Sequence, residues 1–190
     1  MNKYIFASSN PNKLLEISKQ LSHLELLSLN DVEYFDEIIE SGMNLRENAL
    51  IKSKTIFDKY NIATIADDTG LEVYALNGEP GVFSARYAGQ QANAHENINK
   101  LLSKMNNVKD RRARFRTVIS LTTNNEQLFF EGVVDGIVTD KTTGQSGFGY
   151  DPIFVPNGFK KTFAEMSLEE KNTISHRSQA IKKLIEYLKI

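Results

Sequence analysis

Asp67 and Asp68 are two adjacent carboxylates that follow the apolar run 62–66 and precede Thr69 and Gly70. Carboxylates beside a buried segment are costly unless they are solvated, paired or bound to a cation. Mg²⁺ commonly takes one or two protein carboxylates together with substrate phosphates. The pattern therefore favours a site for a hard cation, and the local alternative is an Asx-type turn that closes the strand.

A second candidate segment lies between a short apolar run, 3–8, and a stretch with helical periodicity. It consists of Ser8, Ser9, Asn10, Pro11, Asn12 and Lys13. The turn from a strand into a helix aims backbone N–H groups and the positive helix end at a ligand, which suits phosphate. Lys13 would add a point charge. The alternative is that Asn10 and Pro11 only cap and start the helix.

A glycine-rich loop forms the third candidate. It contains Gly147, Phe148, Gly149, Tyr150 and Asp151. Glycines permit close backbone approach to a ligand, Phe148 offers an aromatic face, and Asp151 accepts hydrogen bonds. A plain turn before a strand explains the same residues. The sequence has no Gly-Lys-Ser/Thr ending of a Walker phosphate loop.

Cationic residues near the last helix form the fourth candidate, with Lys171 followed by Ser175, His176 and Arg177. The planar guanidinium of Arg177 suits carbonyl or phosphate oxygens. Cations at a helix N-terminus oppose the helix dipole, which favours a functional reason for Arg177 over a solvated first turn.

Two other patterns could indicate a protease or a nucleic-acid-binding surface, but the sequence supports neither strongly. Asp68-Thr69-Gly70 matches the Asp-Thr-Gly loop of aspartic proteases, but a single copy would need a homodimer to complete the catalytic pair. Arg112, Arg114 and Arg116 alternate along a predicted strand, which is typical of a solvated strand face. The net charge of −1 offers no basic field for nucleic acid or an anionic membrane.

The elements that must position these residues indicate an α/β protein. We expect strands at 3–8, 26–29, 62–66 and 153–155, helices at 14–24, from residue 44, at 92–105 and at the C-terminus, and a hairpin with arms 112–122 and 127–138. Ser167 and Glu170 form a capping-box pattern. The sheet should be mixed, parallel early and antiparallel later.

The chain of 190 residues is expected to form one domain over 1–190. The sequence has no cysteine, which excludes disulfides, thiolate metal sites and cysteine nucleophiles. It has neither a signal-like apolar stretch at its start nor a run of about 20 apolar residues. We therefore expect a cytoplasmic protein without a membrane or nucleic-acid partner.

The order and spacing of five motifs resemble the inosine triphosphate pyrophosphatases, also called dITP/XTP pyrophosphatases, over essentially the whole chain. The motifs are Ser8–Lys13, Glu40-Ser41-Gly42 with Glu47-Asn48-Ala49, Ile65–Leu71, Gly78–Tyr87, and Gly147–Pro152 with the following Ile174–Arg177. The resemblance implies an elongated α/β fold, with a mixed sheet flanked by helices and two lobes around a central cleft. It also implies a cytoplasmic homodimer.

The resemblance further implies Mg²⁺-dependent hydrolysis of ITP, dITP or XTP to the monophosphate and pyrophosphate. By motif position, Ser8–Lys13 would bind the triphosphate. Asp68 would be the general base and a metal ligand, with Thr69 beside it. Phe148, Gly149, Tyr150, Asp151, Lys171, His176 and Arg177 would surround the base and sugar. Many bacterial relatives carry a further acid at the position of Ile39, so Glu40 is the candidate second metal ligand here.

Such a site should select its base by hydrogen bonding. Hypoxanthine and xanthine present a 6-oxo acceptor, whereas adenine presents an amino donor that would leave a protein donor unpaired. We expect Asp68→Asn to keep the fold and lose turnover, and Arg177→Ala to affect selectivity more than stability. The non-enzymatic alternative is a nucleotide sensor that binds the same ligands without releasing pyrophosphate.

Overall fold

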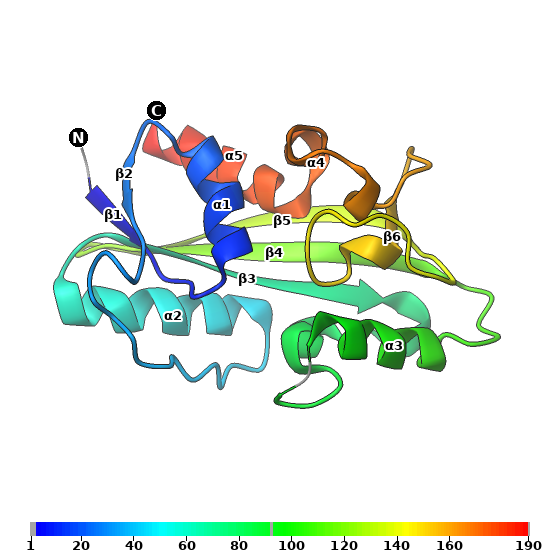
Figure 1. Cartoon of the computed structure of the whole chain (residues 1–190). Helices are drawn as coiled ribbons and strands as arrows, with labels where there is room; N and C mark the ends of the chain where they lie inside the picture. The colour runs from blue at the N-terminus through cyan, green and yellow to red at the C-terminus, as the bar shows by residue number, and fades with distance from the viewer. Residues whose placement is uncertain (1–2, 92, 190) are drawn as a thin grey trace. The chain divides into compact units, whose positions relative to one another are not determined.

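A mixed sheet with strand order β2-β1-β3-β4-β5-β6 organises the computed structural model, which describes residues 3–91 and 93–189 (Figure 1). The strands are β1 (Lys3–Phe6), β2 (Glu25–Leu27), β3 (Thr64–Val73), β4 (Arg112–Thr122), β5 (Gln127–Val138) and β6 (Phe154–Pro156). The α-helices are α1 (Pro11–Gln20), α2 (Leu45–Tyr60), α3 (Ala94–Lys104), α4 (Leu168–Ile174) and α5 (His176–Leu188). β1 is parallel to β2 and β3, and β5 is antiparallel to β6, so the predicted mixed α/β sheet is confirmed.

β3 corrects the predicted boundary at Asp67. We expected a strand over 62–66 that ends where the two aspartates begin, but β3 runs from Thr64 to Val73 and both aspartates lie inside it. The strand continues because these carboxylates meet cationic side chains and because Leu71 and Val73 return to the core. The change from apolar residues to charged residues therefore lies within the strand and does not mark its end.

Several other elements agree with their local patterns. The hairpin arms have the predicted bounds, and α4 begins with the capping box of Ser167 and Glu170. Ala113 and Phe115 on β4 are buried as predicted. The helix predicted at 92–105 is α3, which begins at Ala94, and residue 92 lies outside the described residues.

The chain divides into two compact units. Unit 1 takes the described residues of Met1–Asp68, Thr117–Gly132 and Arg177–Ile190, and unit 2 takes those of Thr69–Arg116 and Val133–His176. β3, β4 and β5 each contribute residues to both units. The single functional domain expected over 1–190 stays a prediction.

Each unit has its own apolar core. In unit 1, α1 and α5 cover one face of the strands and α2 covers the other (Figure 1). Ile17 and Leu184 pack with β1 on the first face, and Ile56 packs on the second. The core of unit 2 gathers residues of α3, β4 and β6, with Phe115 and Phe154 in edge-to-face contact at 4.7 Å. These cores hold β3, the strand that carries Asp68 and Thr69.

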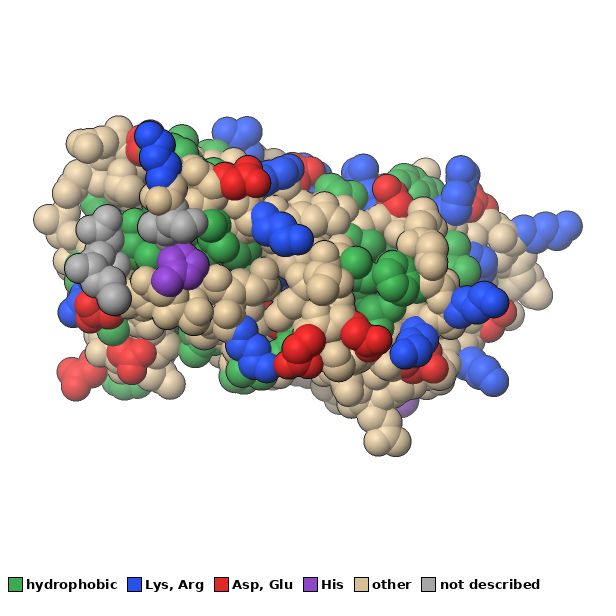
Figure 2. All heavy atoms as spheres, turned by 90° about the horizontal axis from the view of Figure 1, so that it is seen from above, with side chains coloured by type: hydrophobic (Ala, Val, Ile, Leu, Met, Phe, Trp, Pro, Cys, Tyr) green, Lys and Arg blue, Asp and Glu red, His purple; other side chains and the backbone are tan. Residues whose placement is uncertain are grey.

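Surface charge is mixed. Figure 2 shows Lys and Arg side chains scattered among Asp and Glu side chains over the face that it presents, in keeping with the net charge of −1. No helix in the described part of the chain combines the length and apolar character needed to cross a bilayer.

Candidate active site

The segment Ser8–Lys13 follows the end of β1 and enters α1. Asn10 is the N-cap: its Oδ1 accepts hydrogen bonds from the backbone N–H groups of Asn12 at 3.0 Å and Lys13 at 3.3 Å. Pro11 occupies the first helical position, and Ser8 Oγ accepts from Asn10 N at 3.3 Å. Ser9 and Asn12 are exposed. The capping interpretation is thereby confirmed, and the phosphate contacts stay a prediction.

Asp67 lies in a buried network of charges in unit 1. Its Oδ1 is 3.1 Å from Lys13 Nζ, and its Oδ2 accepts from Arg177 Nε at 3.1 Å. Arg177 Nη1 also pairs with the carboxylate of Glu16, one turn after Lys13 on α1. The guanidinium of Arg177 is only 1% exposed and thus engages two carboxylates at once. These contacts support a positioning role for Arg177, while its contact with a base stays a prediction.

The surroundings of Asp67 shift several pKa values. Burial raises the pKa of Asp67, but the charges of Lys13 and Arg177 outweigh burial and hold that pKa below its ordinary value. Burial also lowers the pKa of Lys13, and the attraction of Asp67 only partly offsets it. Asp67 is therefore a fixed negative charge that anchors two cations, rather than a group that exchanges protons near neutral pH.

Asp68, the next residue on β3, has different surroundings. Lys52 Nζ on α2 lies 3.5 Å from Asp68 Oδ1 and donates to Glu40 Oε1 at 2.7 Å. Burial raises the pKa of Asp68 above its ordinary value, although Lys52 and Lys13 oppose this shift. Burial lowers the pKa of Lys52, but Asp68 and Glu40 outweigh it, so that the net shift is upward. The pKa values of these adjacent aspartates are thus shifted in opposite directions by their surroundings.

The donor set around Lys52 fits Mg²⁺ when phosphate is also bound. Glu40 and Asp68 converge on one cation, the Lys52 ammonium, from a loop and a strand. Within residues 3–91 and 93–189, no group of three or more His, Cys, Asp or Glu side chains is placed to hold a metal. Two carboxylates alone suit a Mg²⁺ that arrives with substrate phosphates. Ile39, at the position of the further acid in relatives, is exposed.

Unit 2 brings together several of the residues predicted to surround the base and sugar. Lys171 Nζ on α4 donates to Asp151 Oδ2 at 2.6 Å, and both side chains are buried. The same oxygen accepts from Phe148 N at 2.9 Å, and Lys171 Nζ lies 5.0 Å from the centre of the Phe148 ring. Gly147 adopts a φ of +73°, and a Cβ at this position would lie 2.1 Å from Asp151 Oδ2. Only glycine allows this loop to close on Asp151.

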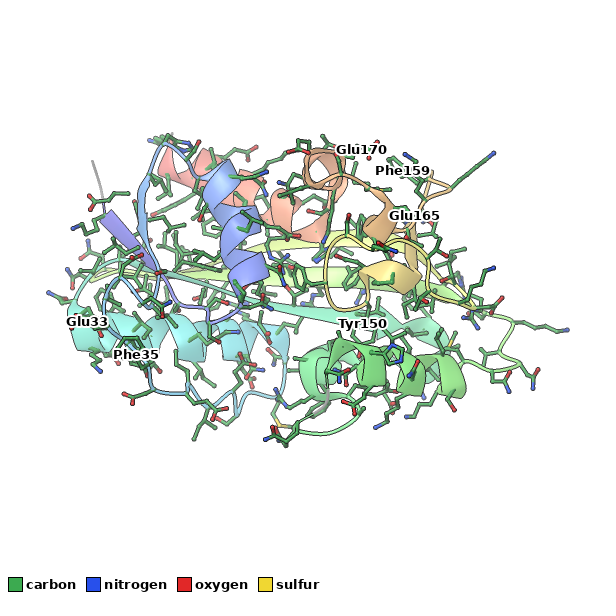
Figure 3. The ribbon with its side chains drawn as sticks, in the orientation of Figure 1. Glu33, Phe35, Tyr150, Phe159, Glu165 and Glu170 are labelled. Carbon is green, nitrogen blue, oxygen red and sulfur yellow. The ribbon has the colours of Figure 1, made fainter. Side chains whose placement is uncertain are left out.

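The remaining predicted residues of unit 2 are two buried side chains, Tyr150 and His176, and two half-buried residues, Gly149 and Thr69. Tyr150, labelled in Figure 3, donates from its hydroxyl to the carbonyl of Ser84 at 3.0 Å, and burial raises its pKa. The His176 ring stacks on Phe115 with centroids 4.6 Å apart. Gly149 has a φ of +58°, and Thr69 is half-buried on β3. Tyr150 and His176 are therefore held rigidly, and their contacts with substrate stay predictions.

Sequence reasoning missed Glu16 in the unit 1 network. It predicted Asp67 only as part of a cation site beside Asp68, and it did not predict that Asp67 and Glu16 both pair with Arg177. The signal for Glu16 is its spacing: it lies three residues after Lys13, on the same face of α1. Lys52 was given no role by the sequence, although its spacing of four residues from Asn48 places it on the same face of α2.

The chain matches a known protein family and several of its members in sequence. A model of the Ham1 family matches residues 4–187. A protein of Flavobacterium johnsoniae named dITP/XTP pyrophosphatase is 50% identical over 187 residues, covering 98% of this chain and 97% of its own. A protein of Porphyromonas gingivalis with the same name is 45% identical over 190 residues, with 99% and 98% covered.

Solved structures agree with the sequence relatives. The Ham1 protein of Staphylococcus aureus superposes with a TM-score of 0.91 at 41% identity, covering 99% of this chain and 98% of its own. A HAM1 protein of Coxiella burnetii gives a TM-score of 0.91 at 38% identity, with 100% and 99% covered. The family model, the relatives and the fold agree over the full length, and the chain therefore belongs to the Ham1 family.

Proposed function

We propose that this protein is a nucleoside-triphosphate pyrophosphatase that hydrolyses dITP, ITP and XTP to the monophosphate and pyrophosphate. The relatives named dITP/XTP pyrophosphatase support this reaction. The observation that carries the proposal is the pairing of Asp67 and Asp68 on β3, one held as an anchor for cations and the other with a raised pKa. Removing deaminated purines from the nucleotide pool would be the consequence.

Asp68 is the proposed general base. Burial raises its pKa above the ordinary value, which improves its ability to take a proton from an attacking water. The Lys52 ammonium, 3.5 Å from Asp68 Oδ1, orients the carboxylate, and its charge opposes the rise in the pKa of Asp68. Water attack at the α-phosphorus would release pyrophosphate as the leaving group.

The cations of unit 1 are proposed to bind the triphosphate. Lys13 lies at the start of α1, where the backbone N–H groups and the helix dipole favour phosphate. Asp67 holds Lys13 in place by its ion pair with the ammonium group at 3.1 Å. Mg²⁺, held by Asp68 and Glu40 with the phosphates, would neutralise charge on the transferring group.

The base-reading residues are proposed from unit 2. Lys171 and Asp151 form a buried ion pair beside the Phe148 ring, which combines polar groups with an aromatic face. A 6-oxo purine would accept a hydrogen bond that adenine cannot accept, which costs adenine nucleotides about 1–3 kcal/mol in binding. We therefore expect ITP, dITP and XTP to be preferred over ATP.

One panel of assays tests the function. Pyrophosphate release is measured with ITP, dITP, XTP, ATP and GTP, each with Mg²⁺ and with EDTA. The proposal expects release from the first three only with Mg²⁺. Binding of these nucleotides without release would identify a sensor, and peptide cleavage that survives EDTA would identify a protease. Either result refutes the proposed reaction.

Assembly and location are further proposals that rest on the resemblance to the family. We propose a cytoplasmic homodimer, and light scattering coupled to size-exclusion chromatography tests the dimer. A mass of twice 21.5 kDa supports it, whereas a mass of 21.5 kDa refutes it.

A further inference from the structure

Asn48 on α2 ties the segment that carries Glu40 to the helix. Its Oδ1 accepts a hydrogen bond from the backbone N–H of Gly42 at 2.8 Å, and its side chain is fully buried. The approach is close, because a Cβ on Gly42 would lie 2.6 Å from Asn48 Oδ1 and 2.9 Å from Asn48 N. Gly42 is two residues from Glu40, so this contact restrains the backbone next to Glu40, whose carboxylate accepts from Lys52 Nζ at 2.7 Å.

The other end of the Asn48 amide has no partner. Because Gly42 N–H is a donor, the atom facing it must be the oxygen, and Nδ2 must point away from Gly42. Nδ2 is buried and makes no hydrogen bond to any residue that the structure describes. Buried polar groups in native proteins are nearly always hydrogen-bonded, since an unmade bond there is expensive. A partner from outside the chain is therefore expected.

The position of Asn48 indicates the chemistry of that partner. Lys52 follows four residues later on the same face of α2, and its ammonium contacts both Glu40 and Asp68. Nδ2 is a neutral donor on the helix face that also presents this cation. An anionic oxygen satisfies both a buried N–H donor and a neighbouring ammonium, whereas a cationic or apolar ligand satisfies neither.

We infer that Asn48 is a substrate-binding residue whose Nδ2 donates to an oxygen of the bound triphosphate, while its Oδ1 positions the Glu40 segment. This inference rests on the proposed function, because it takes the triphosphate as the anion. It adds a neutral, uncharged contact to the cations Lys13 and Lys52. It also explains why the buried Nδ2 group of Asn48 has no hydrogen-bond acceptor among the described residues.

Binding of inorganic tripolyphosphate, measured by titration calorimetry with Mg²⁺ present, tests the inference. Asn48→Asp keeps the acceptor for Gly42 N–H, replaces the Nδ2 donor with an anionic oxygen and hence should weaken tripolyphosphate binding by about tenfold to a hundredfold. The matched control is Asn97→Asp. Asn97 is a buried asparagine of unit 2 that uses both ends of its amide, accepting from Ala88 N and donating to Ala85 O. This control should lose thermal stability and bind tripolyphosphate within about twofold of wild type.

Two results overturn the inference: Asn48→Asp protein that binds tripolyphosphate as tightly as wild type, or wild-type protein that does not bind it. If Asn48→Asp does not fold, Asn48→Ser removes the Nδ2 donor without adding charge and enters the same titration. Pyrophosphate release from dITP by wild type is measured alongside. If the wild type releases pyrophosphate and the variant binds tripolyphosphate normally, only the role of Asn48 is refuted. If the wild type releases no pyrophosphate and the variant binds tripolyphosphate weakly, only the proposed reaction is refuted.

Discussion

Replacing Arg177 with methionine removes a buried guanidinium but keeps an apolar side chain about as long as the arginine stem. Arg177 pairs with Glu16 and with Asp67, and all three side chains are at most 5% exposed. Breaking a buried ion pair by removing one partner costs about 3–5 kcal/mol, because the other charge stays buried. Lys13 still faces Asp67 at 3.1 Å, so we expect a loss near the middle of that range, about 4 kcal/mol. This expectation replaces the sequence-based one, in which selectivity suffers more than stability.

Equilibrium unfolding in urea measures this loss. With a slope of about 2 kcal/mol per molar urea, a loss of about 4 kcal/mol lowers the midpoint by about 2 M. The matched control is Lys182→Met on the same helix, which removes one exposed positive charge and should change the free energy of unfolding by about 0.5 kcal/mol or less. A midpoint for Arg177→Met within 0.3 M of wild type, an interval of about 0.6 kcal/mol, would refute the reasoning.

A double variant isolates the pair itself. Glu16→Gln should also destabilise the protein, because it leaves Arg177 with one carboxylate fewer. If the two residues interact as the structure indicates, Glu16→Gln with Arg177→Met loses less than the sum of the single losses, by about 0.5–3 kcal/mol. Strict additivity would mean that the two charges do not interact.

Four further predictions address the candidate site. Asp68→Asn should keep its far-ultraviolet circular dichroism spectrum and lower the rate of pyrophosphate release by about 10²–10⁴-fold, and release at the wild-type rate would remove Asp68 as the base. The kcat/KM of wild type should rise with pH through the pKa of Asp68, which lies above its ordinary 3.8, because the base must be deprotonated; a profile that falls over this range contradicts the assignment. The pKa of Asp67, by contrast, lies below its ordinary 3.8 in the folded state. The ionised Asp67 carboxylate therefore stabilises the fold above that pH, and this stabilisation is lost as the pH falls below it. In Asp67→Asn protein, the melting temperature should therefore fall less on acidification than it does in the wild type. Gly147→Ala should destabilise the protein by more than about 1 kcal/mol, because its Cβ would meet Asp151 Oδ2 at 2.1 Å, whereas Gly158→Ala, also at positive φ but in open space, should cost less.

The sequence alone determined those elements that depend on contacts between residues close together in the chain. The hairpin arms 112–122 and 127–138 were predicted with their observed bounds because period-two alternation and a polar turn lie within one short stretch. The same holds for the N-cap at Asn10 and the capping box at Ser167, where donor and acceptor are at most three residues apart. The ordered motifs also predicted the family, which the comparisons confirm.

Tertiary structure alone decided the surroundings of the charges. Asp67 and Arg177 are 110 residues apart in the chain, and Glu16 and Arg177 are 161 apart, so no local pattern links them. β3 continues through Asp67 and Asp68 only because such distant cations compensate their burial. The role of Asn48 likewise depends on which donor faces it in the folded chain. Residue type fixes which charges and donors exist, but burial and distant partners set their pKa values and their remaining hydrogen-bonding capacity.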